Sequence, residues 1–326
     1  MGRFRLLLRR KKKVRAIKNI VKIVAEWKIY DTISVYTSRQ EVGSMDCMVT
    51  LHELLDSFSP SERRVAEYFL DQREQVIGQP IDEVAQACQT SKTTVVRLCK
   101  LAGFHGYKEF CIALSTSLAV SSTGAHVYED VDPGGDLKSI AQQVSKRNIS
   151  AIQNTMGAIE LDTLKQVVHL LHEANRIDFY GQGSSGIVAM DAQSKFMRIG
   201  KYAVSSIDPH VQVVSAATLK KGDVAVLFSY SGETKDILQT CDVCKESGAA
   251  TIALTRYAPN ALAERADIRL AVASVEPDVR SGAMASRTAM LNVVDVLFSA
   301  VTALEYNAAR PSLDRSLHAA MIKKGK

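Results

Sequence analysis

Hydroxyl and glycine residues follow an apolar run near the middle of the chain. Residues 229–234 read Ser-Tyr-Ser-Gly-Glu-Thr; they come directly after the apolar run 223–228 and open a helical stretch at Lys235. Side-chain hydroxyls, a flexible glycine and the N–H groups of a helix start can together hold a phosphate monoester. An ordinary polar turn is the alternative to this phosphate-binding loop. The residues expected to bind the phosphate are Ser229, Ser231, Gly232 and Thr234.

The same arrangement occurs one unit earlier. Residues 176–180 are expected to form a strand, 181–186 (Gly-Gln-Gly-Ser-Ser-Gly) a loop, and 187–199 an amphipathic helix. Ligands of an open parallel sheet bind at the carboxyl ends of the strands, so the two loops should meet at one edge. This loop adds three residues expected to bind the phosphate: Gly183, Ser184 and Ser185.

A dinucleotide site is an alternative for the earlier loop. Gly181, Gly183 and Gly186 match the G-x-G-x-x-G pattern, and Asp208 follows Gly186 by about the distance expected of a ribose-binding acid. A dinucleotide loop needs only backbone, however, so the serine hydroxyls and the second hydroxyl loop favour a phosphate monoester. We expect no cofactor.

A pair of helices upstream has the layout of a helix-turn-helix. Residues 80–88 carry an apolar face, 89–91 form a short polar break, and a second helix is expected from Lys92 to Ala102, before Gly103. Val95, Leu98, Cys99 and Leu101 are its expected core residues. Two packed helices with a solvated face would show the same pattern. The residues expected to contact DNA lie at the start and on the exposed face of the second helix: Ser91, Lys92, Thr93, Thr94, Arg97 and Lys100.

Together with Ser286-Arg-Thr-Ala-Met-Leu-x-x-x-Asp295, these loops resemble a sugar isomerase (SIS) domain, and with the upstream helices the chain resembles the RpiR/MurR family of bacterial transcription regulators. The resemblance covers about residues 46–310. It implies a helix-turn-helix domain joined to a self-associating SIS domain that senses a phosphorylated sugar. Ser286 and Arg287 would meet the sugar hydroxyls. Expected partners are therefore an inverted-repeat DNA operator, a sugar phosphate and further copies of the chain as a homodimer or homotetramer.

A sugar-phosphate isomerase is the alternative function, because the SIS fold also occurs in enzymes. Isomerisation needs a base beside the phosphate, and Glu276 and His210 are the candidates. Neither lies in a pattern specific for catalysis. We therefore expect a regulator that binds without turnover, acting as repressor or activator of carbohydrate metabolism.

The charge of the chain is unevenly distributed. The chain of 326 residues has a net charge of +6. The first 44 residues hold 12 of the 41 Lys and Arg and 3 of the 35 Asp and Glu, which leaves residues 45–326 with a net charge of −3. DNA contact must therefore come from a local basic patch. The basic head itself is expected to be either a DNA-binding arm or a leader that precedes a start at Met45 or Met48.

The six cysteines are scattered, which suits a reducing cytoplasm. Cys241-x-x-Cys244 falls inside an expected helix without a second Cys or His pair, so we expect no metal site. No apolar run reaches a membrane-spanning length by inspection, and no membrane partner is expected.

The expected fold is an all-α helix-turn-helix domain followed by an α/β three-layer sandwich with a parallel sheet. The expected boundaries are 1–44 for the extension, 45–120 for the DNA-binding domain, 121–136 for a linker and 137–326 for the SIS domain. Helices are expected at 51–58, 61–71, 81–88, 92–102, 107–118, 137–156, 161–174, 187–199, from 235 and at 286–306, with strands near 176–180, 202–207, 223–228, 250–255 and 268–272.

Overall fold

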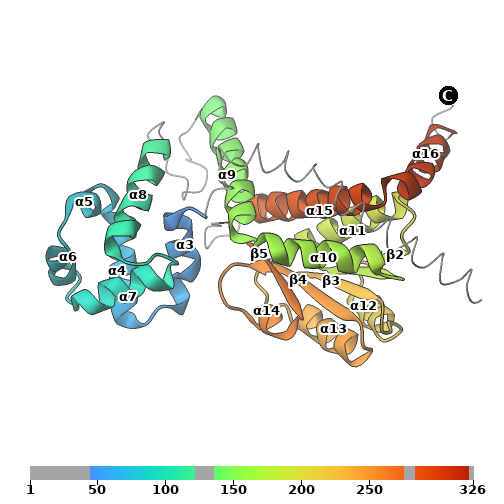
Figure 1. Cartoon of the computed structure of the whole chain (residues 1–326), viewed down its shortest axis with the longest axis horizontal. Coiled ribbons are helices and arrows are strands. Elements are labelled where there is room, and N and C mark those ends of the chain that lie inside the picture. The colour runs from blue at the N-terminus through green and yellow to red at the C-terminus, as the bar shows by residue number, and fades with distance from the viewer. Residues whose placement is uncertain (1–44, 122–135, 275–282, 323–326) are drawn as a thin grey trace, which may run out of the picture. The chain divides into compact units, whose positions relative to one another are not determined.

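The computed structural model describes residues 45–121, 136–274 and 283–322, and these residues belong to one compact unit of the chain. They comprise a helical region and a five-stranded α/β region (Figure 1). This is the expected fold class. The extension 1–44, most of the expected linker and Glu276 lie outside the described residues.

The helical region follows the expected order, with one addition. Its helices are α3 (Cys47–Leu54), the 3₁₀ turn η1 (Leu55–Ser57), α4 (Pro60–Asp71), α5 (Arg73–Gly78), α6 (Ile81–Ala87), α7 (Lys92–Leu101) and α8 (Tyr107–Ser121). The first helix begins four residues before the expected Leu51, because the Asp46 carboxylate accepts the backbone N–H groups of Met48 and Val49 and caps it. The short helix α5 was not expected from the sequence.

Aromatic stacking forms the core of the helical region. The ring of Phe69 stacks on Phe110 with 4.7 Å between centroids, and Phe104 meets Phe110 edge-on at 5.5 Å. Val95, Leu98 and Cys99 of α7 are buried against this core, as expected. The expectation for Leu101 was wrong: its side chain is 52% exposed, because it lies at the end of α7.

The α/β region contains five parallel strands: β1 (Ile177–Gly181), β2 (Ala203–Ser206), β3 (Val224–Phe228), β4 (Ala250–Arg256) and β5 (Ile268–Val272). Its helices are α9 (Leu137–Ala158), α10 (Leu161–Glu173), α11 (Gly183–Arg198), α12 (Pro209–Ala216), α13 (Lys235–Glu246), α14 (Ala261–Arg265), α15 (Met284–Leu304) and α16 (Tyr306–Ile322). The strand order is β2-β1-β3-β4-β5. The strands match the expected ranges to within about one residue at most ends, whereas α12, α14 and α16 were not expected.

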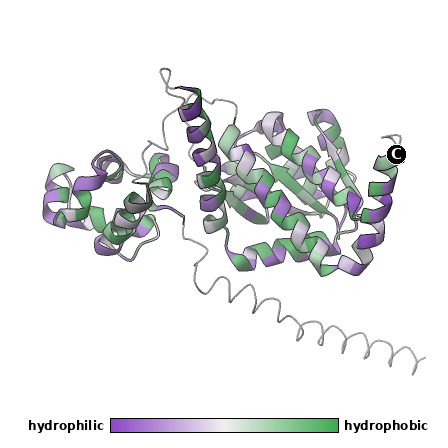
Figure 2. Cartoon of the chain, turned by 90° about the horizontal axis from the view of Figure 1, so that it is seen from above, coloured by the Kyte–Doolittle hydropathy of each residue, from purple (hydrophilic) through white to green (hydrophobic). Residues whose placement is uncertain are grey.

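Helices cover both faces of the sheet (Figure 1). One core gathers side chains from α9, α10, α11 and α15 against Phe179, Val226 and Phe228. A second core lies under α12, α13 and α14, against Tyr180 and Leu227. Figure 2 shows the strands as largely hydrophobic, as the burial of both faces of a parallel sheet requires. The expected three-layer sandwich is therefore confirmed.

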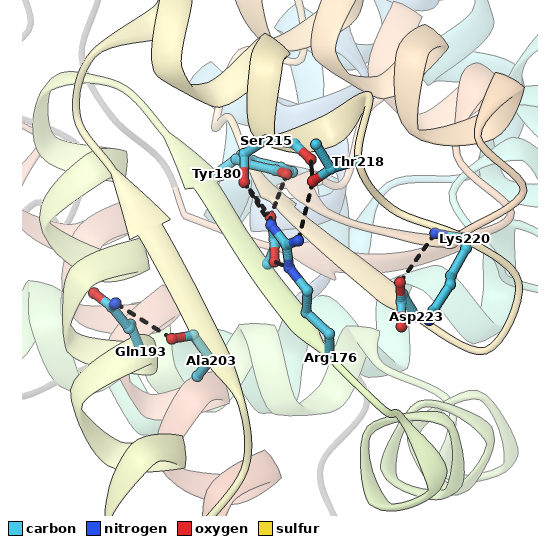
Figure 3. Close-up of polar contacts among 9 residues, drawn as sticks. Arg176, Tyr180, Gln193, Ala203, Ser215, Thr218, Lys220 and Asp223 are labelled. Atoms are coloured by element: carbon cyan, nitrogen blue, oxygen red, sulfur yellow. Dashed lines mark hydrogen bonds and ion pairs between the residues drawn. The ribbon is translucent and has the colours of Figure 1, made fainter.

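A buried polar network fixes β1 to α12 (Figure 3). The Arg176 guanidinium donates to both carboxylate oxygens of Asp178, at 2.7 and 2.8 Å, and to the hydroxyls of Ser215 and Thr218. Asp178 is fully buried and also accepts from Tyr180 at 2.6 Å. A buried carboxylate is stable here because each of its oxygens has charged or hydroxyl partners.

Helix α15 contradicts the expectation about membrane-spanning runs. It has 21 residues and is apolar enough in composition to cross a membrane. Its inward side chains, among them Ala289, Val293 and Leu297, are buried in the core of the α/β region. Core helices of globular domains reach the same apolar composition, so length and composition alone are weak evidence for a membrane span.

Candidate functional site

Two hydroxyl-bearing loops lie side by side although 46 residues separate Ser185 from Ser231. They follow β1 and β3, which pair in parallel with Gly181 opposite Phe228. The chain goes from β1 to the edge strand β2 and then returns to the other side of β1, so β1 and β3 flank the point where the strand order reverses. Ligands of open α/β sheets bind at this point.

The loop after β1 is tighter than expected from the sequence. Helix α11 begins at Gly183 and not at Ile187, so Ser184 and Ser185 lie in its first turn. The four first N–H groups of a helix have no partner within it and favour an anion. A Cβ atom at Gly181 would lie 2.6 Å from the carbonyl oxygen of Ser185, so only glycine allows this strand-to-helix turn.

The loop after β3 is held by its own hydroxyl groups. The Ser229 hydroxyl accepts the N–H of Gly232 at 3.2 Å and lies 3.2 Å from the Thr234 hydroxyl. Gly232 has a φ of +70°, and a Cβ atom there would lie 1.9 Å from Oδ1 of the buried Asn260. The glycine is therefore required by a neighbour from the β4–α14 loop as well as by its backbone conformation.

Helix α15 provides the third side of the site. Its start is preceded by Ala283, which has a left-handed conformation with φ of 54°. Ser286, Arg287 and Met290 lie on the first turns of this helix and face the two loops, so that a cavity of about 280 Å³ is enclosed. We call it the hydroxyl-lined cavity. Its lining residues are Gln182, Gly183, Ser184, Ser185, Phe228, Ser229, Tyr230, Ser231, Thr234, Ala283, Ser286, Arg287 and Met290.

The cavity brings together eight of the nine residues expected to bind the ligand. The ninth, Gly232, does not line the cavity but shapes the loop beneath it. The sequence analysis missed Gln182, Phe228, Tyr230, Ala283 and Met290. Met290 could have been found because it follows Ser286 by one helical turn, and Gln182 because it lies inside the first loop.

Arg287 is the one cationic side chain among the described residues that line the cavity, and none of those lining residues is acidic or a histidine. Hydroxyl groups, helix-start N–H groups and one guanidinium form an environment suited to an anionic group carried by a polar molecule of the size of a sugar. Chemically, the arrangement can bind and orient a phosphate group.

The other polar candidates lie elsewhere. The Asp208 carboxylate accepts the N–H groups of His210 and Val211 at 2.8 and 3.4 Å, so it caps α12. His210 is exposed on that helix and does not line the cavity. Cys241 and Cys244 are buried in α13, where burial raises the pKa of the Cys241 thiol to about 11. No cluster of three potential metal ligands is found among the described residues.

The second candidate surface is the start of α7. Ser91 caps this helix by accepting the N–H of Thr94 at 3.2 Å, and its hydroxyl lies 3.0 Å from the Thr94 hydroxyl. Lys92, Thr93 and Lys100 are exposed. The turn before it contains Gln89 with a φ of 49°, and the Arg64 guanidinium of α4 donates to the carbonyl of Gln89 at 3.3 Å.

Two of the expected DNA contacts form ion pairs within the chain. Arg97 donates from Nε to the Glu62 carboxylate at 2.6 Å; its side chain is 57% exposed, whereas that of Glu62 is 8% exposed. Lys92 forms an ion pair with Asp82 of α6. The hydrogen bonds from Ser59 and Arg97 lower the pKa of Glu62. Arg97 therefore orients α7 against α4, in addition to any contact it makes with DNA.

Comparison with known proteins identifies the two domains that carry these surfaces. Residues 45–121 match the helix-turn-helix domain of the rpiR family, and residues 170–300 match the SIS domain. The chain is 40% identical over 265 residues to an uncharacterised HTH-type transcriptional regulator of Caldanaerobacter subterraneus subsp. tengcongensis, covering 80% of this chain and 92% of that protein. It is 33% identical to the uncharacterised HTH-type transcriptional regulator YbbH of Bacillus subtilis, covering 82% of this chain and 95% of that protein.

Among solved structures, the chain is similar to the Vibrio vulnificus NanR protein complexed with ManNAc-6P. The TM-score is 0.54 at 28% identity, covering 84% of this chain and 98% of the NanR chain. The sugar isomerase domain of an RpiR transcription factor from Sphaerobacter thermophilus has a TM-score of 0.51 at 19% identity, which shows the shared fold. The two domain matches, the two regulators and the geometry of both surfaces lead to one conclusion. The chain belongs to the rpiR family of helix-turn-helix transcriptional regulators that carry a SIS domain.

Proposed function

We propose that this regulator binds a phosphorylated sugar in the hydroxyl-lined cavity and that the bound ligand controls its affinity for DNA. The observation that carries the proposal is the convergence of Ser184 and Ser185 at the start of α11 with Ser229, Ser231 and Thr234 on the neighbouring loop. The phosphate would lie between these two groups. Arg287 and Ser286, on α15, would then face the sugar.

The ligand class is tested by calorimetry with ManNAc-6P, glucose 6-phosphate and arabinose 5-phosphate, each paired with its unphosphorylated parent. We expect at least one phosphate ester to bind and its parent to bind much more weakly, because hydrogen bonds to a charged group contribute about 1.5–3 kcal/mol each. Equal affinity for ester and parent would contradict the proposal.

Ser231→Ala is expected to weaken the binding of that ester by roughly 10-fold or more, since it removes one hydroxyl from the phosphate side of the cavity. Ser231 is a better choice than Ser229, because the Ser229 hydroxyl contacts both Gly232 and Thr234 of the loop, whereas the Ser231 hydroxyl accepts the N–H of the nearby Glu233 at 3.3 Å. The matched control is Ser145→Ala on the exposed face of α9. Unchanged affinity in Ser231→Ala would place the phosphate elsewhere.

The isomerase alternative is tested on the same ligand. NMR of the bound ester should show no exchange between aldose and ketose forms, as expected of a regulator that binds without turnover. Exchange that is abolished by Glu276→Gln would show that the protein is a sugar-phosphate isomerase.

DNA binding is proposed for the start and the exposed face of α7. Lys92 and Arg97, which form ion pairs with Asp82 and Glu62, belong to this surface. The other proposed contacts are Ser91, Thr93, Thr94 and Lys100. Recognition helices enter the major groove with their first turns. The cytoplasm is the compartment in which such a regulator would act.

A further inference from the structure

Helix α3 contributes to two hydrophobic cores at once. Cys47, Met48 and Leu51 are buried in the core of the helix-turn-helix region. Val49 is 3% exposed and packs with Ala273, which follows β5. Side chains four residues apart lie on the same face of a helix, so Glu53 lies on the same face as Val49. This helix therefore presents one face to each of the two regions.

The Glu53 carboxylate forms hydrogen bonds to the α/β region. Its Oε1 atom accepts from the Tyr230 hydroxyl at 3.1 Å and from the backbone N–H of Ser274 at 3.1 Å. The Tyr230 hydroxyl also donates to the carbonyl of Ser274. A carboxylate from the helix-turn-helix region, a tyrosine from the loop after β3 and Ser274, two residues beyond the end of β5, are thus hydrogen-bonded to one another.

One of the α/β partners of Glu53, Tyr230, belongs to the hydroxyl-lined cavity. Tyr230 lines it and is flanked in the chain by Ser229 and Ser231, which also line it. Its carbonyl accepts the N–H of Arg256 at 2.9 Å, so the backbone is tied to β4 while the side chain reaches Glu53.

A ligand in the cavity would lie beside Tyr230. A phosphate held by Ser229 and Ser231 fixes the backbone on both sides of this residue, and the tyrosine ring transmits any rotation of that backbone to its hydroxyl. A hydrogen bond of 3.1 Å responds to displacements of a few tenths of an ångström. A ligand changes an equilibrium only through different contacts in the two states, and this contact provides such a difference.

We propose that the hydrogen bonds of Glu53 to Tyr230 and Ser274 are the contact through which ligand binding in the cavity changes the DNA affinity of the helix-turn-helix region. The inference rests on the proposed function and adds its regulatory route. In it, Glu53 is a positioning residue of α3: it touches neither ligand nor DNA, and it sets how firmly α3 is held to the ligand loop. Coupling of this kind typically changes affinity 5-fold to 150-fold.

The test measures a coupling ratio, the DNA dissociation constant with ligand divided by the constant without it. The probe is ManNAc-6P, or glucose 6-phosphate in case ManNAc-6P does not bind, and the DNA is a duplex selected by the unliganded protein from a random library. Ligand affinity is measured in parallel by calorimetry. Glu53→Ala should bring the coupling ratio at least threefold closer to one while ligand affinity stays within about twofold of wild type. Tyr230→Phe, which removes only the hydroxyl, should bring the ratio equally close to one.

Glu53→Gln should restore coupling, because the amide oxygen can accept the same two hydrogen bonds. The matched controls are Glu246→Gln at the exposed end of α13 and Tyr202→Phe, whose side chain is exposed, and both should keep the wild-type ratio. Wild-type coupling retained in both Glu53→Ala and Tyr230→Phe would overturn this inference alone. If neither probe binds the wild-type protein, arabinose 5-phosphate takes their place. Failure of all three sugar phosphates to bind would overturn the proposed function, and this inference with it.

Discussion

Gly232 is the residue at which backbone conformation and a neighbouring side chain impose the same requirement. Its positive φ disfavours a side chain, and Asn260 fills the position of a Cβ atom. Asn260 cannot move away freely, because its Oδ1 atom accepts from Thr255 at 3.1 Å and from the N–H of Ala263 at 3.0 Å. The shape of the loop after β3 therefore depends on a hydrogen-bonded residue outside that loop.

Gly232→Ala should lower the free energy of unfolding by at least about 1–3 kcal/mol, measured by chemical denaturation. Gly78→Ala is the matched control: nothing lies within 4 Å of its added Cβ atom and its φ is not positive. A Gly232→Ala protein as stable as the Gly78→Ala protein would show that Asn260 can be displaced without cost.

The Glu53 carboxyl group is expected to make stability depend on pH. Burial raises its pKa from 4.5 to about 7, against the lowering effect of its hydrogen bonds to Ser274, Tyr230 and Ala258 and of the positive charge of Arg256. The folded state thus holds a proton between about pH 4.5 and 7 that the unfolded state has lost, so the free energy of unfolding falls as pH rises through this window and then levels off.

The difference in unfolding free energy between wild type and Glu53→Gln isolates this effect, since glutamine does not titrate. Relative to the variant, wild type should lose up to roughly 3 kcal/mol between pH 4.5 and 8, as followed by urea denaturation. Glu246→Gln, an exposed carboxylate, should show no such difference. A flat difference for Glu53→Gln would mean that the carboxyl is solvated.

At the scale of elements, α7 is held at its start by a cap and along its length by a buried acid. Ser91 provides the cap, and the Arg97–Glu62 ion pair connects α7 to α4. Arg97 orients α7 and is also proposed to contact DNA, so its replacement would change DNA affinity in two ways. The two effects are separated by one variant of Arg97 and one of Glu62.

Arg97→Ala should reduce DNA affinity by about 1–3 kcal/mol and relax sequence preference at one position, whereas Lys100→Ala should weaken all sequences alike and lower the salt slope by about one. Both are measured by fluorescence anisotropy across a salt series. Glu62→Gln keeps Arg97 and weakens its ion pair. Loss of preference in Glu62→Gln equal to that in Arg97→Ala would assign Arg97 to orientation and not to base recognition. Lys165→Ala on α10 is the control for a change of charge alone.

For the whole molecule, one helix-turn-helix reads too few base pairs for useful specificity, so we expect at least two copies to act together. The protein should protect an inverted repeat whose half-sites are separated by one helical turn, about 34–36 Å, or a multiple of it. Footprinting and analytical ultracentrifugation check this. A monomer at micromolar concentration, or a footprint without two-fold symmetry, would contradict the expectation.

The sequence by itself determined the five strands, the longer helices of the expected fold and most of the residues that line the cavity. Strand, loop and helix are local patterns: the apolar runs before Gly181 and Ser229 and the hydroxyls after them depend on neighbours within a few residues. The meeting of the two loops at one edge was predicted because parallel sheets bind ligands at the carboxyl ends of their strands, whereas the pairing of β1 with β3 came from the structure. The helix-turn-helix layout was readable for the same reason, because spacing and capping are short-range properties.

Only the tertiary structure decided which distant residues complete these patterns. Glu53 and Tyr230 are 177 residues apart, and Arg97 and Glu62 are 35 apart. No periodicity marks such pairs, because the contacts arise from how whole helices pack after the chain has folded. The same holds for Gly232, whose need for glycine comes in part from Asn260. Local sequence patterns indicate which groups are available, and the packing of distant elements decides which of them meet.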